Sequence, residues 1–100
     1  MRLTDVETDA IRYCAKRVFG QACVVRLFGS RLDDRRRGGD IDLHVIAETP
    51  ALATVQNEVL FAMALKDLIG EQRIDVIARA PGFPPQGIDD VALRTGEIVA

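Results

Sequence analysis

The residues of this chain that are best suited to chemistry are a glycine–serine pair and three aspartates. Gly29 and Ser30 end a short apolar stretch, nine further residues follow, and Asp40 and Asp42 then open a second apolar stretch. Asp75 lies within a third apolar stretch. A glycine turn can hold phosphate oxygens, and carboxylates that meet can hold divalent cations. Together these residue types point to a site for the phosphates of a nucleotide.

Asp40 and Asp42 are separated by one apolar residue at the start of a strand predicted over residues 41–47. Residues i and i+2 of a strand point the same way, with Cα atoms roughly 6.5 Å apart. Two such carboxylates on an otherwise buried strand cost free energy unless a cation compensates them. Mg²⁺ prefers this oxygen environment and keeps positions open for substrate phosphates. We therefore expect Asp40 and Asp42 to be metal ligands.

Asp75 lies in a further strand, predicted over residues 73–78. If that strand lies beside residues 41–47, the Asp75 carboxylate completes the cluster. Three carboxylates suit two metal ions about 3.5–4 Å apart, and a carboxylate there can also accept the proton of an attacking hydroxyl. The alternative is that Asp75 forms a surface ion pair with Arg73.

Gly29 and Ser30 supply the predicted phosphate site. A glycine directly after a strand lets the backbone approach an anion closely, and the serine amide and hydroxyl can bind phosphate oxygens. Arg31, with some of the arginines at 35–37, can neutralise a triphosphate or a leaving pyrophosphate. An ordinary turn followed by a solvated loop is the alternative interpretation. The combination with three aspartates favours nucleotidyl transfer from a nucleoside triphosphate.

Two other motif interpretations fail on detail. An EF-hand counted from Asp40 needs an oxygen ligand and a glycine where His44 and Val45 stand. A P-loop needs Gly-Lys-Ser or Gly-Lys-Thr, which the sequence does not contain. His44 shares the predicted face of Asp42, and we expect a structural histidine there rather than a ligand. Tyr13 is predicted to pack.

Hydrophobic periodicity predicts the elements that position these residues. The helices are expected at residues 4–19, from Thr49-Pro50 to Gly70, and at 88–95; the strands at 22–28, 41–47 and 73–78, with a final extended piece at 97–99. Thr4 and Glu7 form a capping box, and Val6 opens the apolar stripe of the first helix. This is an α/β (α+β) pattern with helices packed on a small mixed sheet, whose strand order the pattern leaves open.

Composition sets broad limits. One hundred residues, 48% of them apolar, predict a single folded domain over 1–100, and a net charge of −2 gives no general attraction to nucleic acid. The absence of a long apolar run argues against a membrane span and favours a cytoplasmic protein. Cys14 and Cys23 are expected to be free and buried. The helix at 51–69 has few charges, so we expect burial on several sides, centrally under the sheet; the alternative is a surface for a partner.

The quoted residues also carry a family resemblance. Phe28-Gly29-Ser30-Arg31 followed by Gly39-Asp40-Ile41-Asp42-Leu43 resembles the signature of minimal nucleotidyltransferases, within the DNA polymerase β-like nucleotidyltransferase superfamily. The likeness covers nearly the whole chain. It implies that Gly29 and Ser30 hold the triphosphate, next to Arg31, and that Asp40 and Asp42 hold Mg²⁺. It also implies that Asp75 completes the metal site and helps to activate the acceptor hydroxyl.

Members of this family of similar size are often antitoxins of HEPN/MNT toxin–antitoxin systems. The resemblance therefore implies transfer of AMP from ATP, with two Mg²⁺ ions, to a tyrosine hydroxyl of a partner HEPN-domain ribonuclease toxin. From the charge and apolar pattern of the sequence itself, we expect no membrane and no direct nucleic-acid partner. Two alternatives stay open: an antitoxin that only binds its toxin, and nucleotidyl transfer to a small molecule such as an aminoglycoside.

Overall fold

A computed structural model describes residues 3–29 and 40–100 of the chain. The elements of these residues are, in order, α1 (Asp5–Phe19), β1 (Val24–Phe28), β2 (Ile41–Ile46), the 3₁₀ helix η2 (Pro50–Leu52), α2 (Val55–Ile69), β3 (Ile74–Arg79), α3 (Ile88–Thr95) and β4 (Glu97–Ile98). The predicted order of helices and strands is confirmed, and the final extended piece is a strand of the sheet.

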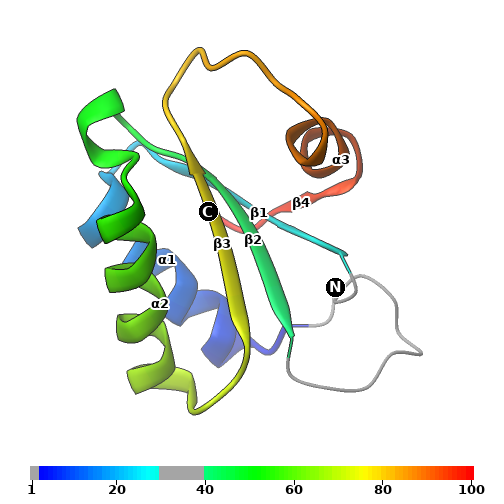
Figure 1. Cartoon of the computed structure of the whole chain (residues 1–100). Coiled ribbons are helices and arrows are strands. Elements are labelled where there is room, and N and C mark those ends of the chain that lie inside the picture. The colour runs from blue at the N-terminus through cyan, green and yellow to red at the C-terminus, as the bar shows by residue number, and fades with distance from the viewer. Residues whose placement is uncertain (1–2, 30–39) are drawn as a thin grey trace.

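The described strands form one mixed sheet in the order β3-β2-β1-β4. β1 is antiparallel to both β2 and β4, whereas β2 and β3 are parallel. Parallel neighbours need a crossover connection, which α2 supplies here. α1 and α2 cover one face of the sheet and α3 lies on the other (Figure 1). The chain is thus an α/β protein, as predicted.

The main core lies between the sheet and the α1–α2 layer. It includes Leu27 of β1, Leu43 and Val45 of β2, and Phe61 and Leu65 of α2, all with no exposed area. Because side chains alternate along a strand, the residues between these in β2 point to the α3 side. The predicted division of β2 into an apolar face and an Asp42–His44 face is confirmed.

α1 begins where its capping box predicts. The Glu7 N–H donates to Thr4 Oγ1 at 3.1 Å, and the Thr4 N–H donates to Glu7 Oε1 at 2.9 Å. The prediction that Val6 belongs to the buried stripe is wrong, since 69% of this side chain is exposed. With 3.6 residues per turn, Val6 points about 140° away from the fully buried Ile11, and so away from the core.

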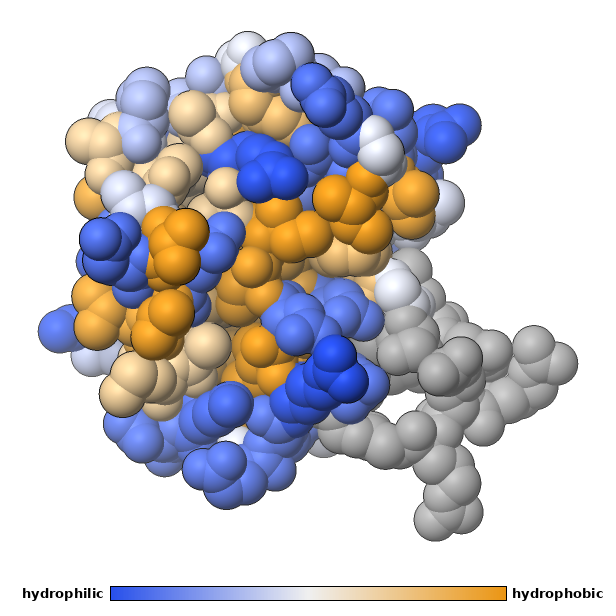
Figure 2. Space-filling view, in the orientation of Figure 1, coloured by the Kyte–Doolittle hydropathy of each residue, from blue (hydrophilic) through white to orange (hydrophobic). Residues whose placement is uncertain are grey.

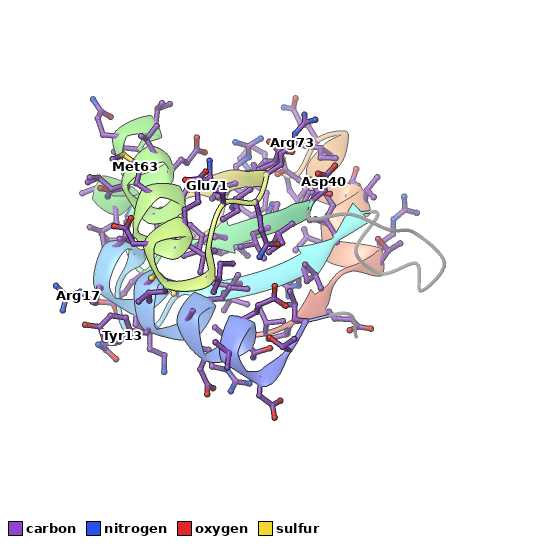
Figure 3. All side chains as sticks on the ribbon, turned by 90° about the horizontal axis from the view of Figure 1, so that it is seen from below. Tyr13, Arg17, Asp40, Met63, Glu71 and Arg73 are labelled. Atoms are coloured by element: carbon purple, nitrogen blue, oxygen red, sulfur yellow. The ribbon has the colours of Figure 1, made fainter. Side chains whose placement is uncertain are left out.

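The expected packing of Tyr13 is also wrong. Tyr13 is 57% exposed and lies on the outer side of α1 with Arg17 (Figure 3). Arg17 donates to the Tyr13 hydroxyl at 3.2 Å, and its guanidinium carbon lies 5.4 Å from the ring centre. The i and i+4 spacing on one helix accounts for this contact, which needs no burial in the core.

The long second helix starts later than predicted. Thr49 precedes only the 3₁₀ turn η2 and makes no side-chain cap, whereas Thr54 caps α2 by accepting from the Asn57 N–H at 3.1 Å. The Asn57 side chain also donates to the Leu52 carbonyl at 2.9 Å, which ties the turn to the helix. Thr49 and Thr54 are both of a residue type that can cap a helix. Because Thr54 makes the cap, α2 begins after it and the 3₁₀ turn is a separate element.

α2 is not buried on several sides as predicted. Of its residues only Phe61 and Leu65 are buried, because the helix lies at the outside of the molecule and only one side of it meets α1 and the sheet. Its exposed large apolar residues are Val55, Val59, Leu60, Met63 and Leu68. Met63 lies on the outer side of the helix (Figure 3). The apolar composition of α2 therefore produces an uncovered surface.

Cys14 and Cys23 are free and buried, as predicted, and burial raises the pKa of both thiols above the ordinary value. Among the residues that the structure describes, none of the helices has the length and apolar character needed to cross a membrane.

Candidate active site

The parallel pairing of β2 and β3 brings two of the three aspartates together. Its register places Asp42 directly opposite Asp75, so both side chains lie on the same face of the sheet. Asp40 stands just before β2 begins. The Ile41 N–H donates to the Arg73 carbonyl at 2.9 Å, which holds the two strand starts side by side. Figure 3 shows Asp40 and Arg73 at this end of the sheet.

Two neighbouring carboxylates influence the ionisation of Asp42. The pKa of Asp42 is raised, first because the carboxyl is partly removed from water. Asp75, as a nearby negative charge and hydrogen-bond partner, raises the pKa further, and the charge of Asp40 adds to this. The positive charge of Arg73 acts in the opposite direction. The site therefore disfavours the ionised form of Asp42 unless a cation is bound.

The alternative role considered for Asp75, an ion pair with Arg73, is also present. Arg73 Nε lies 3.3 Å from Asp75 Oδ2. The side chains are 71% and 53% exposed, so water screens this pair and its contribution to stability is small. Asp75 therefore faces Asp42 on one side and solvent on the other, where it is accessible to a substrate.

Gly29 lies against the Asp42 carboxylate. Its φ of 78° is in the left-handed region that favours glycine, and a Cβ atom added there would lie 2.5 Å from Asp42 Oδ2. The end of β1 thus lies so near this carboxylate that a side chain at position 29 would collide with it. The predicted phosphate-binding residues Ser30 and Arg31 lie outside the described residues.

Replacing Gly29 with alanine is expected to damage the site more than the fold. The unfavourable φ costs about 1–3 kcal/mol, and the new methyl group must also displace the Asp42 carboxylate. Gly82→Ala is a matched control, because Gly82 has a φ of 79° and no atom within 4 Å of an added Cβ. Chemical unfolding should show a loss of stability in both variants, and the activity proposed below should be reduced only by Gly29→Ala. Equal activities would contradict a role for Gly29 in the site.

The donor set at this end of the sheet fits Mg²⁺. Among residues 3–29 and 40–100, no three His, Cys, Asp or Glu side chains are arranged as a complete metal site. The geometry instead gives a facing pair, Asp42 and Asp75, with Asp40 close enough to affect the charge of Asp42. Proteins commonly hold Mg²⁺ by one or two carboxylates, with substrate phosphates and water as the other ligands. The pair and the adjacent Gly29 backbone suit that mode.

A second polar cluster on the same face was missed by the sequence analysis. His44 is fully buried, and its Nε2 atom lies 2.9 Å from Oδ1 of Asp89 on α3. Arg79 Nε donates to the same oxygen at 3.0 Å, and the Gln86 N–H donates to Asp89 Oδ2 at 3.3 Å. The Phe83 ring lies 5.7 Å from the imidazole. The burial supports the expected structural histidine, and the cluster attaches α3 to β2 and β3.

The sequence held only a weak signal for Asp89. An aspartate in the first turn of a helix is common because it suits the helix dipole. Burial by itself disfavours the ionised form of Asp89, but the hydrogen bonds from His44 and Gln86 and the charge and hydrogen bond of Arg79 outweigh burial and lower its pKa. Asp89 is therefore ionised at neutral pH and accepts the His44 N–H.

The lowered pKa of Asp89 predicts a loss of stability in acid. A carboxyl whose pKa is lower in the folded state contributes stability above its unfolded pKa of about 4, and that stability disappears as the pH falls through the folded value. Urea unfolding between pH 7 and pH 3 should show a falling free energy of unfolding. The slope below pH 4 should be smaller in Asp89→Asn, and an unchanged slope would contradict the assignment.

Comparisons with known proteins give no family for the chain. A scan against models of protein families finds no match, and no curated protein matches the sequence. The family resemblance of the Gly-Ser and aspartate motifs therefore stays a prediction, and the function stays a proposal based on the residues and their geometry.

Proposed function

We propose that this protein is a Mg²⁺-dependent nucleotidyltransferase with the nucleotidyltransferase fold, and that it transfers AMP from ATP to a tyrosine hydroxyl of a partner HEPN-domain ribonuclease toxin. As the antitoxin it neutralises that toxin. The observation that supports this most strongly is the facing pair Asp42 and Asp75, with the Gly29 backbone against Asp42. Nucleotidyl transfer needs a group that can hold phosphates beside carboxylates that can hold a metal ion, and the closeness of Gly29 to this pair supports that arrangement.

Each residue has a role in the proposed reaction. Gly29 and Ser30 would hold the triphosphate, and Arg31 would balance its charge. The facing pair Asp42 and Asp75, with Asp40 beside it, would hold the two Mg²⁺ ions. Bound Mg²⁺ neutralises charge on the phosphates. The acceptor oxygen forms a bond to the α-phosphorus, and the bond from that phosphorus to the β-phosphate oxygen breaks, which releases pyrophosphate. The hydroxyl proton passes to Asp75 and then to water.

The exposure of Asp75 favours an acceptor on a separate molecule. Its side chain is 53% exposed at an edge strand, so an incoming hydroxyl can reach it without a rearrangement of the sheet. Asp42 lies deeper, between Asp75 and the β1 end. The nucleotide is thus expected on the β1 side of Asp42 and the acceptor on the β3 side.

The test is intact mass spectrometry of both chains after incubation with ATP, Mg²⁺ and the product of the neighbouring gene. A gain of AMP on that partner, lost when Mg²⁺ is chelated, is the expected result. A stable complex without AMP transfer would instead indicate an antitoxin that only binds. AMP on added aminoglycosides, but not on the partner, would indicate a small-molecule enzyme.

A further inference from the structure

A groove runs between α2 and the outer edge of β3. It has a volume of about 200 Å³, and its lining residues are Glu58, Val59, Ala62, Ile74, Asp75 and Val76. Asp75 therefore belongs both to this groove and to the carboxylate pair. Figure 2, which views the molecule from the β3 side, shows hydrophobic surface over α2 and β3. The groove thus runs along the β3 edge past Asp75, whose side chain lies on the Asp42 face of the sheet.

β3 is an edge strand with outward-facing peptide groups. The Ile41 N–H donates to the Arg73 carbonyl, and the Ala47 N–H to the Arg79 carbonyl, each at 2.9 Å. Because peptide groups alternate in direction along a strand, those of the even-numbered residues 74, 76 and 78 point away from β2. They form the edge of the sheet that another strand can join.

One of these outward groups is already occupied. The Glu58 carboxylate accepts the Ala78 N–H at 2.8 Å, which blocks that end of the edge. The outward groups of Ile74 and Val76, on either side of Asp75, lie along the groove. An extended segment can therefore pair with β3 only beside Asp75, and this limits its register.

Strand geometry then determines where the side chains of such a segment lie. Residues directly opposite in neighbouring strands share a face, with Cβ atoms about 4.5–5.5 Å apart. A residue opposite Asp75 would therefore present its side chain on the Asp42–Asp75 face. The residues before and after it would point to the α2 side, onto Val59 and Ala62. Val59 is 52% exposed, so it offers apolar surface to them.

We propose that the acceptor is a protein segment that adds to the β3 edge as a strand, with a hydroxyl residue beside Asp75 and an apolar residue on either side of it. This inference rests on the proposed nucleotidyl transfer and adds how and where the acceptor binds. The apolar surface of Val55, Val59 and Leu60, which continues from the groove, fits a protein better than a polar small molecule.

The test compares Val59→Glu with Leu68→Glu. Both residues are apolar, lie on α2 and are equally exposed, at 52% and 53%, but Leu68 faces the groove between α1 and α2. With the neighbouring gene product as acceptor, Val59→Glu should raise KM for that protein at least about tenfold, and Leu68→Glu less than about twofold. The affinity for Mg²⁺-ATP, measured from the rise in unfolding temperature that it causes, should match that of wild type in both variants. Equal KM values for the two variants would overturn the inference.

A second variant tests strand addition itself. Val76→Pro removes an outward N–H without removing a bond to β2, a position where an edge strand tolerates proline. It should also raise KM for the protein acceptor while Mg²⁺-ATP binding is kept; an unchanged KM would overturn strand addition.

Two further results would separate the inference from the proposed function. If sedimentation shows a wild-type dimer that Val59→Glu dissociates, a second copy covers the groove and the inference fails, although transfer can still occur. If wild type binds Mg²⁺-ATP but transfers AMP to no protein, the proposed function fails and the inference fails with it.

Discussion

Replacing Asp42 with asparagine is expected to reduce the proposed AMP transfer by about 10²–10³-fold or more without weakening the fold. Asp42 is the carboxylate that touches both halves of the site, because it faces Asp75 and lies against Gly29. Its pKa is raised by burial and by the neighbouring aspartates, so the folded chain disfavours its charge. An uncharged amide should relieve that repulsion, and the metal-free variant should unfold at the same or a slightly higher temperature than wild type.

Initial rates and thermal unfolding, each with and without Mg²⁺, test this expectation. Asp67→Asn is the matched control, since Asp67 is exposed on α2 and has no place in the site. The control should keep wild-type rates and the wild-type increase in stability on addition of Mg²⁺, and Asp42→Asn should lose both. Transfer by Asp42→Asn at the wild-type rate would exclude this carboxylate from the chemistry.

Replacing Asp89 with alanine is expected to give the largest loss of stability, about 3–5 kcal/mol. Asp89 is 3% exposed and accepts from His44, Arg79 and the Gln86 N–H. Its removal leaves His44 Nε2 buried without an acceptor and the Arg79 charge without its partner. Because the cluster joins α3 to β2 and β3, we expect α3 to lose its position on the sheet first.

Asp90 provides the control for this effect. It is the next residue of α3 and is exposed, so Asp90→Ala should cost less than about 1 kcal/mol, mainly through the helix dipole. Urea unfolding measures both losses, and hydrogen exchange of the α3 amides shows whether that helix detaches. Similar losses in the two variants would contradict a structural role for the buried cluster.

The local parts of this protein were predictable because neighbouring residues determine them. The Thr4–Glu7 capping box starts α1, and residues 88–95 form α3 as predicted. The alternation along β2 predicted that Asp42 and His44 share a face. The same local rules failed at Thr49, because Thr54 can cap a helix equally well and a sequence pattern cannot rank two such caps.

By itself, the sequence determined the chemical groups of the candidate site and the strands that carry them. Only the tertiary structure decided which groups meet. The facing of Asp42 and Asp75, the contact of Gly29 with Asp42 and the burial of Asp89 against His44 all join residues from different elements. The uncovered side of α2 was decided in the same way. The physical reason is that strand order and helix placement depend on how the whole core packs, which no local pattern of residues specifies.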